Sequence, residues 1–133
     1  MKSTIIRDAL RIAQEKLPAH PQFDYWPHYT FVVQSNKIVE WGYNTPQEPA
    51  KHLGYNARIS HGVSKTHAEL NAYRAAKGLL NPNKSFEIVN IRLSRQGSIR
   101  NSQPCACCFS FLSDLGCTHC WFSTDCGFAK IGM

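Results

Sequence analysis

Two short segments constrain this chain most, because each combines metal-binding residue types with a predicted helix start. The first contains His67, and the second contains Cys105 and Cys108 directly after Pro104. A catalytic zinc site uses three protein ligands and leaves a fourth position for water, and one histidine with two thiolates meets this requirement. Cysteines three apart on a helix point from the same face, which excludes Cys107. The sequence therefore predicts a zinc site made of His67, Cys105 and Cys108.

Glu69 lies two positions after His67 and provides the acid–base group that such a site needs. The positive end of a helix dipole favours thiolate over thiol at Cys105, and bound zinc acidifies its water. A carboxylate beside the metal can take the proton of that water and pass it on. We therefore predict that Glu69 is catalytic. A capping box formed by Thr66 and Glu69 would explain the same carboxylate without catalysis.

The six cysteines of the chain admit other arrangements. Nothing at the amino terminus resembles a secretory signal, so we expect reduced thiols in the cytoplasm rather than three disulfides. Cys105 and Cys108 could join Cys117 and Cys120 in a four-cysteine structural site, which would make the chain a non-catalytic zinc-binding interaction module. The eight residues between the two pairs are fewer than zinc ribbons usually have. Glu69 also argues against a structural site, which has no use for an unliganded carboxylate.

The hydrophobic patterns predict an alternation of helices and strands. We expect helices over residues 3–17, 66–80 and 105–115, and strands over residues 29–34, 38–43, 86–93 and 118–123. Ser3 or Thr4 is the expected cap of the first helix, and Gly116 the expected end of the last. Residues 44–65 form a long loop, which in a small domain is usually functional. The order of elements indicates an α/β fold, with a sheet sandwiched between helices, rather than a helix bundle or an all-β fold.

The strand over residues 86–93 alternates clearly enough to assign its two faces. One face carries Phe86, Ile88, Asn90 and Arg92, and the other carries Glu87, Val89, Ile91 and Leu93.

The length and charge of the chain bound the remaining possibilities. A chain of 133 residues, of which 43% are hydrophobic, is expected to form a single domain over residues 1–133. Its net charge of +6 favours anionic partners such as nucleotides, RNA or DNA. The charges are spread along the chain, so a basic soluble surface explains them equally well. No stretch is long enough to span a membrane, and we expect no membrane partner but allow for a homo-oligomer.

The pattern H-x-E followed by P-C-x-x-C resembles the zinc nucleobase deaminases of the cytidine deaminase superfamily. Both halves are present in the right order, 35 residues apart. The resemblance implies a three-layer α/β/α fold, with a mixed sheet covered by helices on both faces and the two zinc-binding helices side by side. It also implies that zinc-activated water attacks C4 of cytosine or C6 of adenine, with Glu69 as acid and base. The main-chain groups at Ala68 and Pro104 would then help to hold the base.

Two segments are particularly similar to deoxycytidylate deaminases, namely residues 67–72 and the Gly-Tyr-Asn sequence of residues 42–44. This similarity implies that Asn44 hydrogen-bonds the sugar, although asparagine is also a common turn residue at the end of a strand. Trp26 and His28 lie in the loop before the first strand. They could stack on the base or its neighbours, or they could belong to the core.

The expected reaction is the hydrolysis of a cytosine-type base to uracil with release of ammonia. The similarity around Glu69 favours a deoxycytidylate-type nucleotide as substrate, whereas the charge and the loop aromatics favour single-stranded nucleic acid. Deamination of adenine in tRNA or another nucleic acid is the alternative within the same superfamily.

Overall fold

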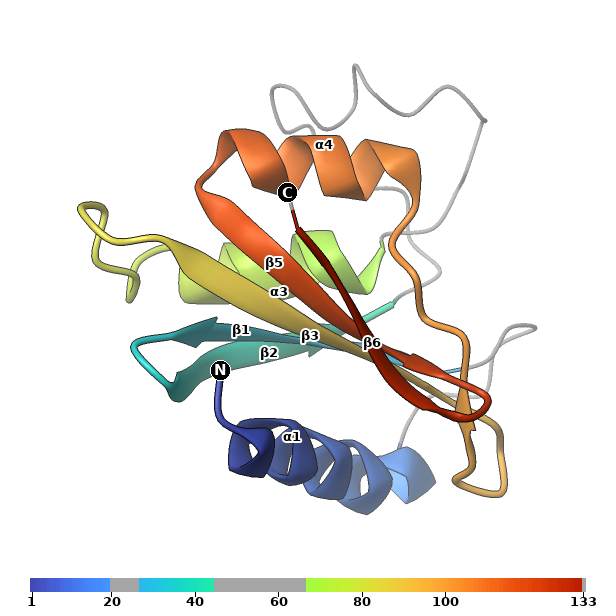
Figure 1. Cartoon of the computed structure of the whole chain (residues 1–133). Helices are drawn as coiled ribbons and strands as arrows, with labels where there is room; N and C mark the ends of the chain where they lie inside the picture. The colour runs from blue at the N-terminus through green and yellow to red at the C-terminus, as the bar shows by residue number, and fades with distance from the viewer. Residues whose placement is uncertain (20–26, 45–66, 133) are drawn as a thin grey trace.

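A computed structural model describes residues 1–19, 27–44 and 67–132 of the chain. The helices in these ranges are α1 (Ser3–Lys16), α3 (Ala68–Ala76) and α4 (Ala106–Asp114), and the strands are β1 (His28–Gln34), β2 (Lys37–Tyr43), β3 (Phe86–Leu93), β4 (Ile99–Arg100), β5 (Cys117–Thr124) and β6 (Gly127–Gly132). The described strands form one sheet in the order β2–β1–β3–β5–β6, with β4 beside β3. Helix α1 covers one face of the sheet, and α3 and α4 cover the other (Figure 1).

The sheet is mixed, and its one parallel pair among the described strands explains the position of α4. Strand β1 pairs antiparallel with β2 and with β3, and β5 pairs antiparallel with β6. Strands β3 and β5 are parallel, so the chain must cross over between them, and α4 lies in this crossover. The predicted three-layer α/β/α arrangement, with a mixed sheet and helices on both faces, is therefore confirmed.

Strand β3 lies at the centre of the sheet and contributes to both layers of the core. Phe86 and Ile88 pack in the cluster beneath α3 and α4, whereas Val89 and Ile91 pack in the cluster beneath α1. The bounds of the strand and its two faces agree with the prediction. Because side chains alternate along a strand, Asn90 and Arg92 point toward the side of α3 and α4.

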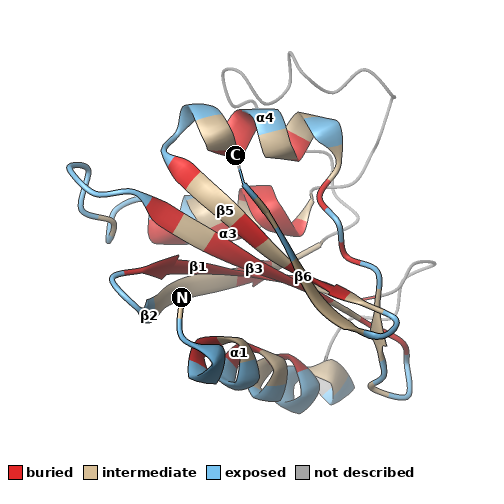
Figure 2. Cartoon of the chain, in the orientation of Figure 1, coloured by how far each residue is buried: buried red, intermediate tan, exposed pale blue. Residues whose placement is uncertain are grey.

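Helix α1 buries one narrow stripe against the sheet, and much of its outer surface is exposed (Figure 2). The buried residues, four apart along the helix, are Ile5, Ala9 and Ala13. The predicted cap is wrong, because the residue at the N-cap is Lys2 and its side chain makes no capping hydrogen bond. The helix ends at Lys16 and continues as a 3₁₀ turn. In the described part of the chain, no helix is both long and apolar enough to cross a membrane.

Several predicted boundaries need correction. Helix α3 ends at Ala76, and Leu79, which we expected to pack, is 65% exposed. Strand β5 is not the last strand, since β6 follows it as an antiparallel neighbour. Strand β4 lies in a segment for which the sequence analysis predicted no strand. The end of α4 is as expected, because Gly116 follows it with a φ of +101°, a backbone conformation that glycine adopts without strain.

Gly42 on β2 allows α3 to approach the sheet very closely. A Cβ atom at this position would lie 2.5 Å from the backbone nitrogen of Ala72 and 2.8 Å from the backbone carbon of Asn71. The Asn71 side chain also donates a hydrogen bond of 2.7 Å to the Tyr43 carbonyl. These contacts fix α3 against β2 and thereby hold the start of the helix in place.

We expect Gly42→Ala to lower the free energy of unfolding by about 1–3 kcal/mol, because the new methyl group must push the backbone of α3 away from β2. Urea unfolding measures this loss. Gly78→Ala is the matched control, since a Cβ atom there would have no contact within 4 Å among the described residues beyond its chain neighbours. Equal stability of the two variants would contradict the close approach of α3 to β2.

Candidate metal and catalytic site

His67, Cys105 and Cys108 come together where α3 and α4 begin. Their ligand atoms all lie within 4.8 Å of one another, and no other set of three or more metal-ligating side chains meets this criterion in the described part of the chain. His67 Nδ1 lies 3.2 Å from Cys108 Sγ and 3.6 Å from Cys105 Sγ. Zinc bonds of about 2.0–2.3 Å at tetrahedral angles would place such atoms about 3.5 Å apart, so the three residues fit a zinc ion.

The start of each helix explains why these side chains converge. His67 is the N-cap residue of α3, and Cys105 is the N-cap residue of α4. Cys108 lies in the first turn of α4, and its backbone N–H donates to Cys105 Sγ at 3.4 Å. Both helices therefore direct the positive end of their dipoles toward one place, which favours anionic ligands. The predicted grouping of the three residues is found in the structure.

The electrostatics of Cys105 also suit a metal ligand. Hydrogen bonds lower the pKa of Cys105 to about 3, with the Cys108 thiol contributing most, followed by His67 and the Cys108 backbone N–H, and burial only partly opposes this decrease. Cys105 is therefore a thiolate at neutral pH, which is the form that binds zinc.

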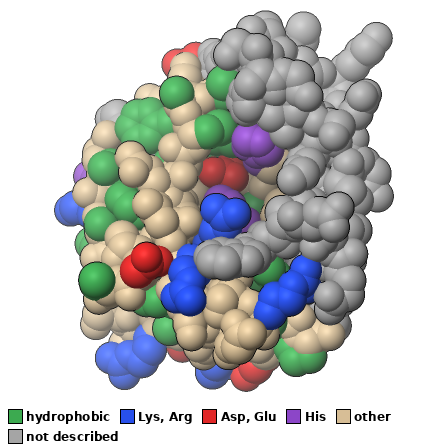
Figure 3. Space-filling model, turned by 90° about the vertical axis from the view of Figure 1, so that its right-hand side faces the viewer, with side chains coloured by type: hydrophobic (Ala, Val, Ile, Leu, Met, Phe, Trp, Pro, Cys, Tyr) green, Lys and Arg blue, Asp and Glu red, His purple; other side chains and the backbone are tan. Residues whose placement is uncertain are grey.

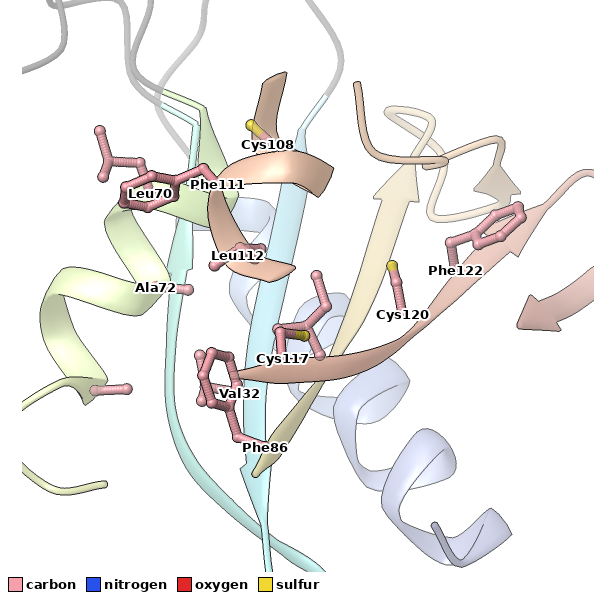
Figure 4. Close-up of a cluster of buried hydrophobic side chains, with 12 residues drawn as sticks. Val32, Leu70, Ala72, Phe86, Cys108, Phe111, Leu112, Cys117, Cys120 and Phe122 are labelled. Atoms are coloured by element: carbon pink, nitrogen blue, oxygen red, sulfur yellow. The ribbon is translucent and has the colours of Figure 1, made fainter. Parts of the chain in front are cut away.

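Cys117 and Cys120 have the opposite character, which is inconsistent with a four-cysteine site. Cys108, Cys117 and Cys120 belong to the same hydrophobic cluster, but Cys117 and Cys120 lie on strand β5 and Cys108 lies on α4 (Figure 4). Burial raises the pKa of Cys117 to about 12 and also raises that of Cys120. Cysteines whose pKa is raised by apolar surroundings are typically unreactive structural residues. The described metal-ligating group contains neither of them.

Glu69 lies in the first turn of α3 and is only 2% exposed. Its Oε2 accepts a hydrogen bond of 3.2 Å from the side chain of Asn90. Its Oε1 is buried and has no hydrogen-bond partner among the described residues. A buried polar atom without a partner is costly, and one that belongs to a carboxylate beside a ligand set is suited to bind a water or substrate atom. The capping-box explanation fails, because the N-cap residue is His67 and Glu69 is one position too early for such a box.

Asn90 is a residue of the site that the sequence analysis missed. It is fully buried, and its Oδ1 accepts a hydrogen bond of 2.7 Å from the Thr30 hydroxyl. This bond fixes the orientation of the amide, so that Nδ2 donates to Glu69 and, at 3.3 Å, to the Ser102 carbonyl. The signal was present in the sequence, since an asparagine on the buried face of a strand needs hydrogen-bond partners.

His28, a predicted substrate contact, lies close to this site. Its Nε2 is buried and has no hydrogen-bond partner among the described residues. Burial lowers the pKa of His28, and the charges of Glu69, Arg92 and His67 also act on it. The face of the molecule in Figure 3 shows histidine, acidic and basic side chains gathered in one hollow.

The other predicted substrate contacts differ in where the structure places them. Asn44 extends the pairing of β1 and β2, because its Oδ1 accepts from the His28 N–H at 3.1 Å and its N–H donates to the His28 carbonyl at 3.2 Å. Ala68 and Pro104 are buried, next to His67 and Cys105 in the sequence. Trp26 lies outside the described residues.

Comparisons with known proteins identify the fold. No family model matches the chain, and no curated protein matches it significantly. Among solved structures, a cytidine deaminase from Burkholderia pseudomallei is 17% identical, with a TM-score of 0.65 over 99% of this chain and 93% of that one. A dCMP deaminase from the cyanophage S-TIM5 is also 17% identical, with a TM-score of 0.58 over 92% of this chain and 84% of that one.

A cytidine deaminase from Mycobacterium leprae is 14% identical, with a TM-score of 0.59 over 94% of this chain and 92% of that one. These similarities extend over nearly the whole chain. The chain therefore has the cytidine deaminase-like α/β fold.

Proposed function

We propose that this chain, which has the cytidine deaminase-like fold, is a zinc-dependent hydrolytic deaminase. It converts a cytosine-type base to uracil in a deoxycytidylate-type nucleotide or in single-stranded nucleic acid. The observation that carries the proposal is the convergence of His67, Cys105 and Cys108 with the buried carboxylate of Glu69 on the same helix as His67. Three ligands leave a fourth position for water, which is the arrangement of catalytic zinc sites.

Each residue has a separate part in the reaction. Zinc, when bound, supplies Lewis-acid activation of a water molecule. Glu69 takes the two protons of this water in turn through Oε1 and delivers one to N3 of the base and the other to the amino group at C4. The water oxygen replaces the amino nitrogen, and ammonia leaves. Burial of Glu69 keeps bulk water away from the proton transfer and strengthens its electrostatic interactions.

The base is held next to Glu69 by groups from both helix starts. In the proposal, the main-chain groups at Ala68 and Pro104 bind its edge, and His28 lies beside it with a buried Nε2 that can hydrogen-bond the substrate. Asn44 keeps the sugar-binding role that the family resemblance implies. Its Oδ1 accepts from the His28 N–H, which holds the Asn44 side chain beside His28.

Asn90 positions Glu69 through Oε2 and leaves Oε1 to carry the proton. We expect Asn90→Ala to lower kcat by about 10–100-fold with little change in KM, because loss of the partner lets the carboxylate turn away from its productive orientation. Thr30→Val removes the hydrogen bond that orients the Asn90 amide and should lower kcat in the same direction by less. Steady-state kinetics measure both effects.

Two controls accompany these variants. The exposed Asn83 lies on the turn before β3, and Asn83→Ala should leave kcat unchanged. The zinc content of each variant shows whether the metal site is intact. A kcat of Asn90→Ala equal to that of the wild type would exclude the positioning role.

A substrate panel tests the proposed function. Ammonia release is measured with dCMP, deoxycytidine, cytidine and cytosine-containing single-stranded DNA and RNA. An adenine-containing tRNA stem-loop distinguishes the alternative base. We expect activity with at least one cytosine substrate in zinc-loaded protein, and none after removal of the metal. If the zinc-bound protein had no activity on any of these substrates, the proposed enzymatic function would be refuted, and a zinc-binding interaction module would remain as the explanation.

A further inference from the structure

Two arginines lie next to the proposed base site because of the pairing register of the sheet. Thr30 on β1 is the partner of Asn90 on β3, and the next pair on the same face, toward the end of β3, consists of His28 and Arg92. Arg92 in turn is the partner of Arg100 on β4. Partner residues of an antiparallel pair point to the same face of the sheet. His28, Arg92 and Arg100 therefore form a row on the face that carries Glu69.

Two further observations indicate that the row of His28, Arg92 and Arg100 lies close to Glu69. Asn90 donates a hydrogen bond to Glu69. Arg92 lies two residues after Asn90 on the same face of β3, so the row of His28, Arg92 and Arg100 begins next to the residue that contacts the carboxylate. The charges of both Arg92 and Glu69 act on His28, which places all three close together. In Figure 3, Lys and Arg side chains adjoin the hollow that holds acidic and histidine side chains.

Buried serines hold the backbone on both sides of the arginine pair. The Ser123 hydroxyl accepts from the Arg92 N–H at 3.0 Å and donates to the Arg100 carbonyl at 2.6 Å. The hydroxyls of Ser123 and Ser102 lie 2.8 Å apart, and both serines are buried. Arg92 and Arg100 are themselves half-buried. The two side chains therefore start from a rigid base, which lowers the entropy cost of binding a ligand.

The chemistry of the pair favours an anion with several oxygens. Two arginines at directly opposed positions of the sheet concentrate positive charge on one side of the site, which attracts an anion. The planar guanidinium group presents paired N–H donors that match phosphate oxygens. Two such groups beside a base site are suited to one phosphate group rather than to a long stretch of phosphates.

We propose that Arg92 and Arg100 bind the phosphate group on the sugar of the nucleotide whose base lies at Glu69. The substrate is then a nucleotide and not a free nucleoside or base. This inference rests on the proposed function for the location of the base, but it assigns a separate subsite to residues of β3 and β4. Arg92 and Arg100 set the specificity for phosphate and take no part in the proton transfer.

Binding of the reaction product tests the subsite without turnover. Isothermal titration calorimetry compares dUMP with deoxyuridine on zinc-loaded protein. We expect the wild type to bind dUMP about 10–100-fold more tightly than deoxyuridine, as hydrogen bonds to charged groups would give. Arg92→Gln and Arg100→Gln should each remove most of this preference and leave deoxyuridine binding unchanged. Arg92→Lys should retain part of it, because the positive charge remains.

Arg7→Gln is the matched control, since Arg7 is an exposed arginine of α1 on the opposite face of the sheet. A short single-stranded DNA with one uracil identifies the source of the phosphate. If Arg92→Gln weakens binding of the oligonucleotide more than binding of dUMP, the phosphate belongs to a nucleic-acid strand. If Arg92→Gln weakens binding of dUMP at least as much as binding of the oligonucleotide, the phosphate belongs to a mononucleotide. The subsite would be overturned if the wild type bound dUMP, deoxyuridine and the oligonucleotide with equal affinity.

The kinetic results separate the subsite from the proposed function. The phosphate subsite would be refuted if dCMP, deoxycytidine and the oligonucleotide were deaminated with equal kcat/KM. The proposed deaminase function would still hold in that case. Arginine-dependent binding of dUMP without deamination of any substrate would refute the proposed function and leave the subsite intact.

Discussion

Glu69→Gln is expected to lower kcat by about 10²–10⁴-fold while the protein remains folded and keeps its zinc, because the variant loses only the group that moves the proton. Glutamine has the shape of glutamate, and its carbonyl oxygen can still accept the hydrogen bond from Asn90. The amide cannot take a proton from water. Steady-state kinetics with the best substrate of the panel measure the loss, and circular dichroism and metal analysis confirm the fold and the zinc content.

Glu87→Gln is the matched control for this variant. Glu87 is a half-buried carboxylate on β3, and its partner is His119 at 3.3 Å rather than a residue of the site. Its replacement should leave kcat unchanged. A Glu69→Gln enzyme with wild-type kcat would exclude Glu69 as the acid–base group, whatever the behaviour of the metal.

Cys108→Ser is expected to abolish both zinc binding and activity. Cys108 is fully buried, and its thiol is the largest contributor to the low pKa of Cys105. The substitution therefore removes one ligand and weakens the thiolate character of a second, while serine is a poor ligand for zinc. Inductively coupled plasma mass spectrometry after dialysis should find about one zinc ion per chain in the wild type and almost none in the variant.

Cys107→Ser separates this effect from a general sensitivity of α4 to substitution. Cys107 is half-buried, precedes Cys108 on the same helix and is absent from the ligand group of the described residues. We expect it to retain zinc and activity. Loss of zinc from Cys107→Ser together with retention by Cys108→Ser would show that the ligands have been assigned wrongly.

The sequence was sufficient to predict that three metal-ligating side chains come together and where the central strand lies. The ligand types lie where helices were expected to start, namely at His67, Cys105 and Cys108. The helical geometry of α4 alone brings Cys105 and Cys108 together. Strand β3 carries apolar side chains on both of its faces, because both faces are buried in the core. Local signals of this kind survive in the fold because tertiary contacts reinforce them.

The elements that the sequence did not predict depend on contacts that are distant along the chain. Strand β6 begins and ends with glycine, so it has a weak intrinsic preference, and its pairing with β5 stabilises it. Strand β4 has two residues and exists through its pairing with β3. Helix α1 starts at Ser3 without a side-chain cap, since burial of its apolar stripe against the sheet is sufficient to hold it.

The parts of the site that were missed are set by strand register. Asn90 meets Glu69, and Arg92 meets His28 and Arg100, only because β1, β3 and β4 pair as they do. A shift of one residue would turn these side chains to the face of α1. The sequence assigned Asn90 and Arg92 to one face of their strand, but it contained no information on which residues would lie opposite.

The origin of the new oxygen in the product tests the central claim most directly. Zinc-loaded protein is incubated with dCMP in water enriched in heavy oxygen, and mass spectrometry follows the base. A hydrolytic deaminase should form uracil that carries one heavy oxygen atom, together with one ammonia per base, and Glu69→Gln should form neither at a comparable rate. Unchanged cytosine in dCMP and in every other substrate of the panel, in protein with a full complement of zinc, would contradict the account.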